Sequence, residues 1–149
     1  MSAKPNIGRP TTHMEVEGEL CKLFYNKFGK EALPLITRAF RDWGLVLGER
    51  LKAKIPQADF KTAVEAYLKP VMDREPPPEI ISSSEDKVEL KVYTCPFALK
   101  DAGQELCEAM MAMDRAILES IIGDDAEMEL PRSVAAGDDH CLGIIKRRC

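Results

Sequence analysis

The sequence predicts an α+β fold in which N-terminal helices precede a small antiparallel sheet and a long Met-rich helix packs across that sheet. Apolar residues recur at helical spacing in three segments before residue 75. Glu75 and the prolines that follow it, at 76–78, then interrupt the chain. Beyond them the apolar period changes to two, most clearly over residues 88–95. Strands with a helix between them are typical of a helix packed on an antiparallel sheet.

Three helices are expected before the prolines. The first spans residues 14–28, the second 31–55 and the third 58–74. In the second helix, Gly44 and Gly48 are four residues apart and share a face. Each glycine costs up to about 1 kcal/mol in helix propensity relative to alanine. Their spacing therefore predicts close packing of a neighbouring helix, with a homodimer through this face as the alternative.

Two strands, one helix and two further strands are expected after the prolines. Their ranges are residues 79–83, 88–95, 103–122, 126–131 and 141–147. In the second strand, the alternation turns Cys95 away from the core-facing side, unless the strand ends before it. Pro96 has no N–H for the ladder and ends the strand.

The length and the Pro-rich break suggest how the chain is organised. Residues 1–12 are expected to be a flexible arm and residues 13–149 a single α+β domain, since 149 residues fit one domain. Within that domain, a helical half (13–75) precedes a Pro-rich connector (75–78), and a strand-helix-strand half (79–149) follows.

The composition excludes several classes of partner. The net charge of −4 and a pI near 5.3 give no basic surface for nucleic acid. No apolar run approaches the ~20 residues that span a bilayer. The N-terminus lacks the apolar core of a signal peptide. The expectation is a cytoplasmic protein with a small-molecule ligand and with neither nucleic acid nor a membrane as partner.

The residues suited to chemistry concentrate around the Met-rich helix. Cys107, Met110, Met111 and Asp114 follow the spacing i, i+3, i+4, i+7 and share one face, and Cys95 ends the strand before them. A carboxylate on an apolar face either pairs with a cation or has a raised pKa, as a general acid or base does. For Asp114, the candidate cations are Arg115, Arg147 or another cation at the helix edge.

Five cysteines in a cytosolic chain are expected to be reduced thiols. Thiolates and an imidazole suit zinc or another thiophilic metal, which makes Cys95, Cys107, His140 and Cys141 candidate ligands. The chain has no C-x-x-C or H-x-x-x-H pair, so these ligands would come singly from separate elements. Strand geometry would also turn His140 and Cys141 to opposite sides. A Cys–His nucleophile and simple buried thiols are the alternatives.

An ordered set of residues runs through most of the chain: Tyr25, Gly29, Glu31-Ala32-Leu33, Gly44, Gly48, Cys95-Pro96-Phe97, Leu106-Cys107, Asp114, Gly137-Asp138 and Cys141. In this order and spacing, the set resembles the L-2-amino-thiazoline-4-carboxylic acid hydrolase family over about residues 14–147. The C-terminal half also resembles the 4-vinyl reductase domain, a small α+β module that binds small hydrophobic ligands.

This resemblance implies hydrolysis of a C–N bond of a small cyclic amidine, opened to a carbamoyl-cysteine by attack of water or a thiol at the amidine carbon. It implies Cys95 or Cys107 as nucleophile or metal ligand, and Asp114 as proton carrier. It also implies that the turn at Gly137 and Asp138 shapes the pocket. The alternative is a non-catalytic module that senses a small molecule or a thiophilic metal.

Overall fold

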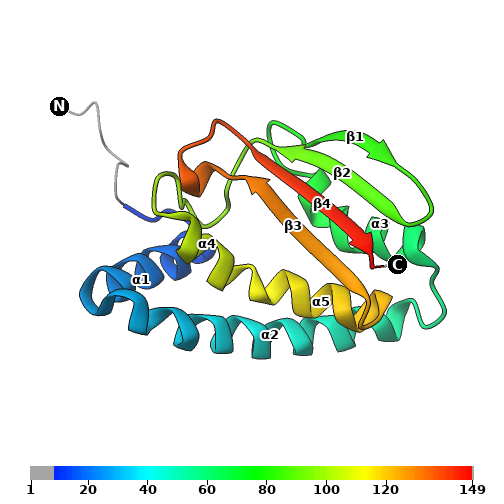
Figure 1. Cartoon of the computed structure of the whole chain (residues 1–149), viewed down its shortest axis with the longest axis horizontal. Coiled ribbons are helices and arrows are strands. Elements are labelled where there is room, and N and C mark those ends of the chain that lie inside the picture. Colours follow the sequence, from blue (N-terminus) through cyan, green and yellow to red (C-terminus); the bar gives the residue numbers. More distant parts are fainter. Residues whose placement is uncertain (1–8, 149) are drawn as a thin grey trace.

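The computed structural model describes residues 9–148 (Figure 1). Residues 1–8, most of the predicted arm, and Cys149 lie outside the described residues. Helices dominate the first half of the chain, and strands alternate with helices in the second. The elements are α1 (His13–Phe28), η1 (Gly29–Glu31), α2 (Ala32–Lys54), α3 (Phe60–Met72), β1 (Glu79–Ser83), β2 (Lys87–Val92), α4 (Gln104–Met110), α5 (Ala112–Ile122), β3 (Ala126–Arg132), η2 (Val134–Ala136) and β4 (Cys141–Arg147).

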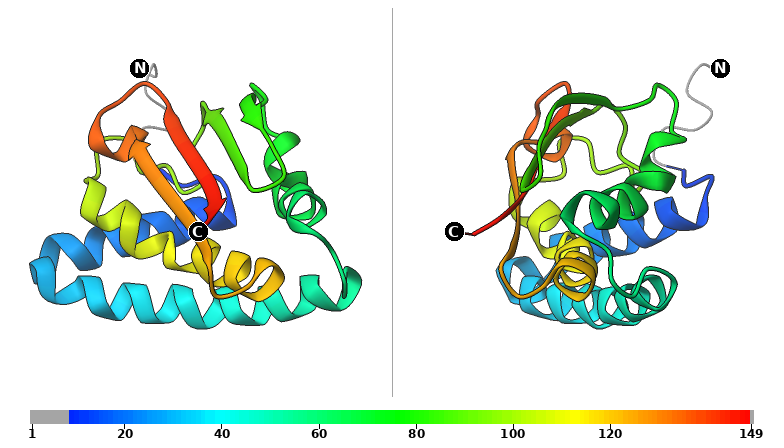
Figure 2. Two further views of the ribbon diagram at one scale, coloured as in Figure 1. Left: turned by 45° about the vertical axis from the view of Figure 1, so that its right-hand side comes forward. Right: turned by 90° about the vertical axis from the view of Figure 1, so that its right-hand side faces the viewer.

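The four strands form one antiparallel sheet in the order β1-β2-β4-β3, which confirms the predicted α+β fold. Helices α3 and α5 lie against one face of this sheet, and α2 lies on the far side of α5 (Figure 2). The last strand in the sequence, β4, is inserted between β2 and β3. This insertion brings the start of β4 beside the end of β2, where Cys141 pairs with Val92.

Gly44 and Gly48 let α2 pack closely on α5, as their spacing predicts. A Cβ on Gly44 would lie 2.8 Å from the Met113 Cα, and a Cβ on Gly48 would lie 2.5 Å from the Ser120 Oγ. Both glycines are buried inside one chain. The alternative prediction, a homodimer through this glycine face, is therefore wrong, because α5 already occupies the face.

The predicted Met-rich helix is interrupted at Met111, which corrects the expectation of one long helix. It consists of α4 and α5, which meet at an angle (Figure 1). The Arg115 guanidinium donates a 3.4 Å hydrogen bond to the Glu108 carbonyl, in the turn where the helix is interrupted. A side chain that takes a helix carbonyl is a known cause of a bend. The sequence periodicity does not reveal this contact.

Strand β2 ends at Val92, three residues before the predicted end at Cys95. The Cys95 carbonyl instead accepts a 3.0 Å hydrogen bond from the Ala98 N–H, which closes a turn around Pro96. The strand alternation consequently does not extend to Cys95, and its side chain turns inward. The sequence predicted an outward direction for Cys95 only if the strand reached it, and the strand ends before Cys95.

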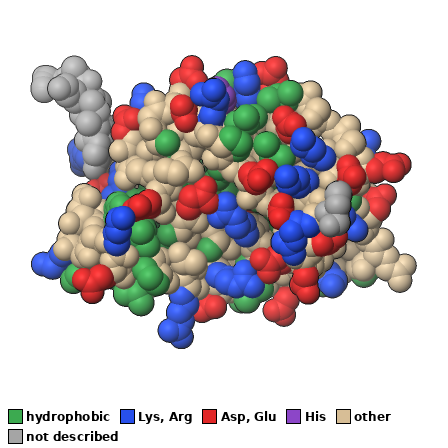
Figure 3. Space-filling model, viewed as in Figure 1, with side chains coloured by type: hydrophobic (Ala, Val, Ile, Leu, Met, Phe, Trp, Pro, Cys, Tyr) green, Lys and Arg blue, Asp and Glu red, His purple; other side chains and the backbone are tan. Residues whose placement is uncertain are grey.

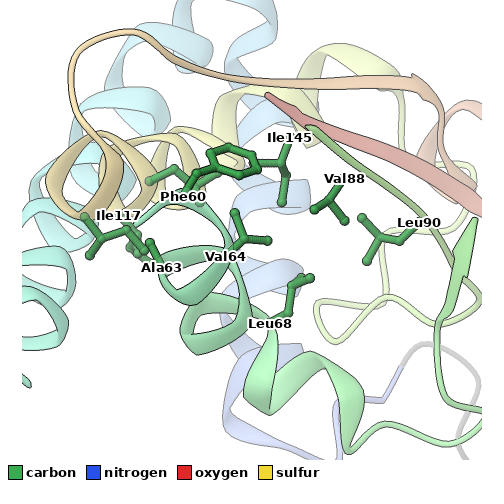
Figure 4. Packing of buried hydrophobic residues seen from close by; sticks show 10 residues of the cluster. Phe60, Ala63, Val64, Leu68, Val88, Leu90, Ile117 and Ile145 are labelled. Carbon is green, nitrogen blue, oxygen red and sulfur yellow. The ribbon is translucent and has the colours of Figure 1, made fainter. Parts of the chain in front are cut away.

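Two clusters of buried apolar residues form the core. The first lies between the sheet and helices α3 and α5, and Figure 4 shows Val64, Leu68, Leu90 and Ile145 facing one another in it. The second surrounds α4 and includes Phe97, Leu99, Leu106 and Met110. Among the described residues, no helix is long and apolar enough to cross a membrane.

Candidate functional site

A cavity of about 140 Å³ lies where the two core clusters meet. Most of its wall is apolar and comes from α3, the sheet, the turn after β2, and helices α4 and α5. The first cluster contributes Leu68, Leu90 and Ile145, and the second contributes Phe97 and Met110. The cavity is therefore built from residues far apart in the sequence that only the folded chain brings together.

Tyr67 and Asp114 form the polar end of this cavity. The Tyr67 hydroxyl donates a 2.7 Å hydrogen bond to the Asp114 Oδ1, which links α3 to α5. Burial raises the pKa of Asp114, while the Tyr67 hydrogen bond and the charge of Arg74 act against that rise. Burial and the neighbouring carboxylate hold the pKa of Tyr67 well above its usual range. Tyr67 thus remains a donor at neutral pH.

Asp114 has a tyrosine and not a cation as its hydrogen-bond partner. Arg115 forms its ion pair with Glu108, at 2.6 Å between Nη2 and Oε1. The Arg147 guanidinium lies over the Phe60 ring, 5.9 Å from the ring centroid. Of the alternatives left open by the sequence, the structure thus favours a carboxyl group with a raised pKa.

Arg74 and Thr94 extend the polar end toward the turn after β2. Both residues line the cavity, and the Arg74 Nη1 donates a 3.5 Å hydrogen bond to the Thr94 carbonyl oxygen. Arg74 is half-buried just after the end of α3, with a guanidinium that presents several donors. This end of the cavity therefore holds a carboxyl, a phenol and a guanidinium group within a largely apolar wall.

Three of the predicted site cysteines line the same cavity. Cys95 comes from the turn after β2, Cys107 from α4 and Cys141 from the first position of β4. Asp114 lines this cavity as well, so Cys95, Cys107 and Asp114, which the family resemblance implies for catalysis, face one space. The Val134 N–H points at the Cys141 sulfur, at 3.5 Å, which fixes the thiol beside η2.

The surroundings of two of these thiols favour their neutral form. Burial, followed by the nearby Cys141 and Cys95, raises the pKa of Cys107 to about 12. Burial also raises the pKa of Cys141, which the Val134 N–H partly offsets. A thiol with a raised pKa is a weak nucleophile at neutral pH, because the thiolate is the reactive form.

His140 lies apart from the three cysteines. Its Nδ1 is 2.6 Å from the Asp139 Oδ1, its ring lies 6.4 Å from the Tyr93 ring, and it does not line the cavity. This agrees with the opposite directions that strand geometry assigns to His140 and Cys141. In the described part of the chain, no three His, Cys, Asp or Glu side chains are grouped as metal ligands. The four-ligand zinc site has no preassembled geometry here and remains a hypothesis.

The turn at Gly137 and Asp138 lies behind the cavity wall. Gly137 has a φ of 103°, which glycine adopts without strain, and the Asp138 Oδ2 accepts a 3.0 Å hydrogen bond from the Ser133 N–H. Neither residue lines the cavity. The turn instead holds the loop that carries Val134. Because the Val134 N–H contacts the Cys141 sulfur, the turn also helps to fix the position of Cys141.

Tyr67, Arg74 and Thr94 are site residues that the sequence reasoning did not select. A signal was present for Tyr67, because helical spacing already placed it on the inward face of the third helix. A polar tip on a core-facing position needs a partner. No comparable pattern marks Arg74 or Thr94, which reach the cavity only through the path of the chain after α3 and β2.

The fold and the cavity define a small α+β protein with a mainly apolar pocket that is polar at one end. The chain belongs to the L-2-amino-thiazoline-4-carboxylic acid hydrolase family, whose model matches residues 12–143. This match confirms the resemblance inferred from the ordered motif residues. Among the curated proteins, no match to this chain was found.

Two solved structures share the fold at low sequence identity. One is the phenol-responsive sensory domain of the transcription activator PoxR with phenol, with a TM-score of 0.64 and 16% identity. The match covers 91% of this chain and 75% of the PoxR chain. The other is a trafficking protein particle complex subunit 3 from Naegleria fowleri covalently bound to palmitic acid, with a TM-score of 0.62 and 12% identity. This second match covers 91% of this chain and 95% of the Naegleria fowleri chain.

Proposed function

We propose that the cavity binds a small molecule with an apolar body and one polar end. The observation that carries this proposal is a mainly apolar space of about 140 Å³ that ends at the Tyr67–Asp114 hydrogen bond. An apolar cavity of about 150 Å³ is large enough to hold a benzene-sized ring. The PoxR domain with phenol, which shares this fold, lends support from a ligand of that size.

The polar end indicates which groups the ligand carries. Asp114 accepts a hydrogen bond from a ligand N–H or O–H, and Tyr67 orients the carboxyl group. Arg74 offers donors to a ligand oxygen or carboxylate. A ring with a donor group on one side and an anionic or carbonyl oxygen nearby matches both residues.

Hydrolysis of a C–N bond in a small cyclic amidine is the second candidate, favoured by the family membership. Water would add its oxygen to the amidine carbon, and Asp114 would take the proton that the water loses. That proton and the second proton of the added water would pass to the ring nitrogen as the ring C–N bond breaks, which leaves a carbonyl group on the former amidine carbon. A carboxyl with a raised pKa holds a proton more readily than an ordinary one, which suits this transfer.

A thiol nucleophile is a less favoured route to the same product. The raised pKa of Cys107 leaves almost no thiolate at neutral pH. Cys95 is the remaining candidate. Its sulfur would attack the amidine carbon in place of water, and the ring C–N bond would break with a proton passing to the ring nitrogen. Water would then cleave the new carbon–sulfur bond, which releases the product and restores the Cys95 thiol. Replacement of Cys95 by serine therefore separates the thiol route from the water route.

The test is calorimetry of the purified chain with phenol and with L-2-amino-thiazoline-4-carboxylate, together with NMR detection of ring opening. Binding without turnover supports a binding module, and turnover that is lost in Asp114→Asn supports the hydrolase. Met111→Trp, which fills the cavity, is expected to abolish binding, whereas Met72→Trp on the exposed side of α3 leaves it unchanged. No binding and no turnover with either compound would contradict both candidates.

A further inference from the structure

Helix α1 buries very little of itself within the chain. Of its 16 residues, only Gly18 is buried, and a Cβ at this position would lie 2.9 Å from the Phe97 carbonyl carbon. The inner side of α1 therefore rests on the turn that carries Cys95 and Phe97. Short helices in proteins gain most of their stability from packing an apolar face, so the outer face of α1 becomes important.

That outer face is apolar and exposed. Val16, Leu20 and Leu23 follow the spacing i, i+4, i+7 and form one stripe, with exposed fractions of 41%, 62% and 56%. Apolar side chains reach the surface at the end of the molecule where α1 and the start of α2 lie (Figure 3). A continuous exposed apolar stripe is typical of a protein–protein contact.

The charges on α1 indicate what covers the stripe. Three acidic residues, Glu15, Glu17 and Glu19, lie in its first half, and Lys22 and Lys27 lie in its second half. Glu19 already pairs with Lys22 at 3.2 Å, while Glu17 and Lys27 lie on opposite sides of the stripe centre along the helix. A two-fold axis midway between Leu20 and Leu23 runs two α1 helices antiparallel and brings each Glu17 to within about one residue of the Lys27 of the other copy.

We propose that two copies of this chain pair through the stripe of Val16, Leu20 and Leu23, with their α1 helices antiparallel. Leu20 of each copy then packs on Leu23 of the other. The charge pattern of α1 is complementary to itself only in this direction, because a parallel pair would set the acidic halves side by side. The pairing does not depend on what the cavity binds.

The test is sedimentation velocity of the full chain over a wide concentration range. The chain, of 16.6 kDa, is expected to sediment as a dimer at high concentration. Leu23→Glu is expected to lower the association constant by at least about tenfold. Val46→Glu, at a position on α2 that is 39% exposed, is the matched control and leaves association unchanged. Because these positions are exposed, the monomers stay folded, as circular dichroism can verify.

Charge reversal tests the antiparallel direction. Glu17→Lys and Lys27→Glu each place like charges together and weaken association several-fold, and the double variant restores it. A chain that stays monomeric at all concentrations overturns the proposal. Equal effects of Leu23→Glu and Val46→Glu also overturn it, as does a double variant no better than the single ones. Association with a different protein through this stripe, with no self-association, would assign the face to another partner and likewise overturn it.

Discussion

The Tyr67 hydroxyl and the Asp114 carboxylate meet at 2.7 Å inside the cavity, although they lie 47 residues apart in the sequence. This hydrogen bond joins the two helices that pack on the sheet, and it supplies the polar end of an otherwise apolar space. It also limits how strongly the stability of the protein depends on pH, because it opposes the effect of burial on the Asp114 pKa.

Asp114→Asn is expected to flatten the dependence of stability on pH. Burial raises the pKa of Asp114 in the folded protein, so the folded state holds this proton to a higher pH than the unfolded chain does. Between the ordinary pKa near 3.8 and the raised one, the free energy of unfolding falls as pH rises. Asparagine still accepts the Tyr67 hydrogen bond but has no proton to lose. Urea unfolding from about pH 4 to about pH 8 measures the difference.

Asp59→Asn is the control of opposite sign. The pKa of Asp59, which caps α3, is lowered first by the hydrogen bond from the Thr62 N–H. The stability that this carboxylate contributes is present above its ordinary pKa and is lost as pH falls through the lowered one. Its replacement thus affects the acid side of the curve. Identical pH profiles for Asp114→Asn and the parent protein would contradict the proposed environment of Asp114.

Tyr67→Phe is expected to destabilise the protein by about 1–3 kcal/mol, because the buried Asp114 carboxyl loses its donor. The pKa of Asp114 rises further, since the hydrogen bond that lowers it is gone. Chemical denaturation gives the first quantity, and NMR titration of the carboxyl carbon gives the second. Tyr93→Phe is the control: its hydroxyl donates to the exposed Glu79, and its loss costs less than about 0.5 kcal/mol. Equal losses in both variants would argue against a special role for Tyr67.

Helical and strand periodicity predicted the order of the elements, because apolar spacing reports which face of each element is buried. The same spacing placed Asp114 with Cys107 on one face, and both line the cavity. What periodicity lacks is the path of the irregular segments. The turn after β2 directs Cys95 inward, and the bend at Met111 depends on an Arg115 side chain from the next turn. Neither contact leaves a repeating pattern in the sequence.

The direction of the His140 side chain shows which part of the candidate site the sequence could predict. Alternation along a strand predicted that His140 and Cys141 face opposite sides, and the structure has Cys141 in the cavity and His140 beside Tyr93. Residue type alone had grouped them as metal ligands. The local geometry was therefore more informative than the chemical identity of the side chains.

Cys107 is expected to resist alkylation in the folded protein. With a pKa of about 12 against an ordinary 9.0, its thiolate fraction at mildly alkaline pH is about a thousandfold smaller. Mass spectrometry after iodoacetamide treatment, with and without urea, measures the protection. The sign for stability is the same as for Asp114: the folded protein keeps the proton longer, and stability falls as pH rises above 9.0. Rapid modification of Cys107 in the native protein would contradict the raised pKa and would make Cys107 a candidate nucleophile again.

Gly44→Ala is expected to destabilise the protein by about 1–3 kcal/mol. The added Cβ would lie 2.8 Å from the Met113 Cα, and backbone atoms cannot move aside as the tip of a side chain does. A gain of up to about 1 kcal/mol in helix propensity offsets only part of this cost. Glu49→Ala, on the exposed side of the same helix, is the control and changes stability little.

The effect of Gly44→Ala should extend into the cavity, because Asp114 directly follows the residue that the new methyl group displaces. If α5 moves away from α2, the Tyr67–Asp114 hydrogen bond lengthens and the Asp114 pKa rises, so Gly44→Ala and Tyr67→Phe should change the same carboxyl titration. In a double-mutant cycle, their effects on the free energy of unfolding are expected to be less than additive. Strict additivity would mean that the packing of α2 on α5 and the polar end of the cavity are independent.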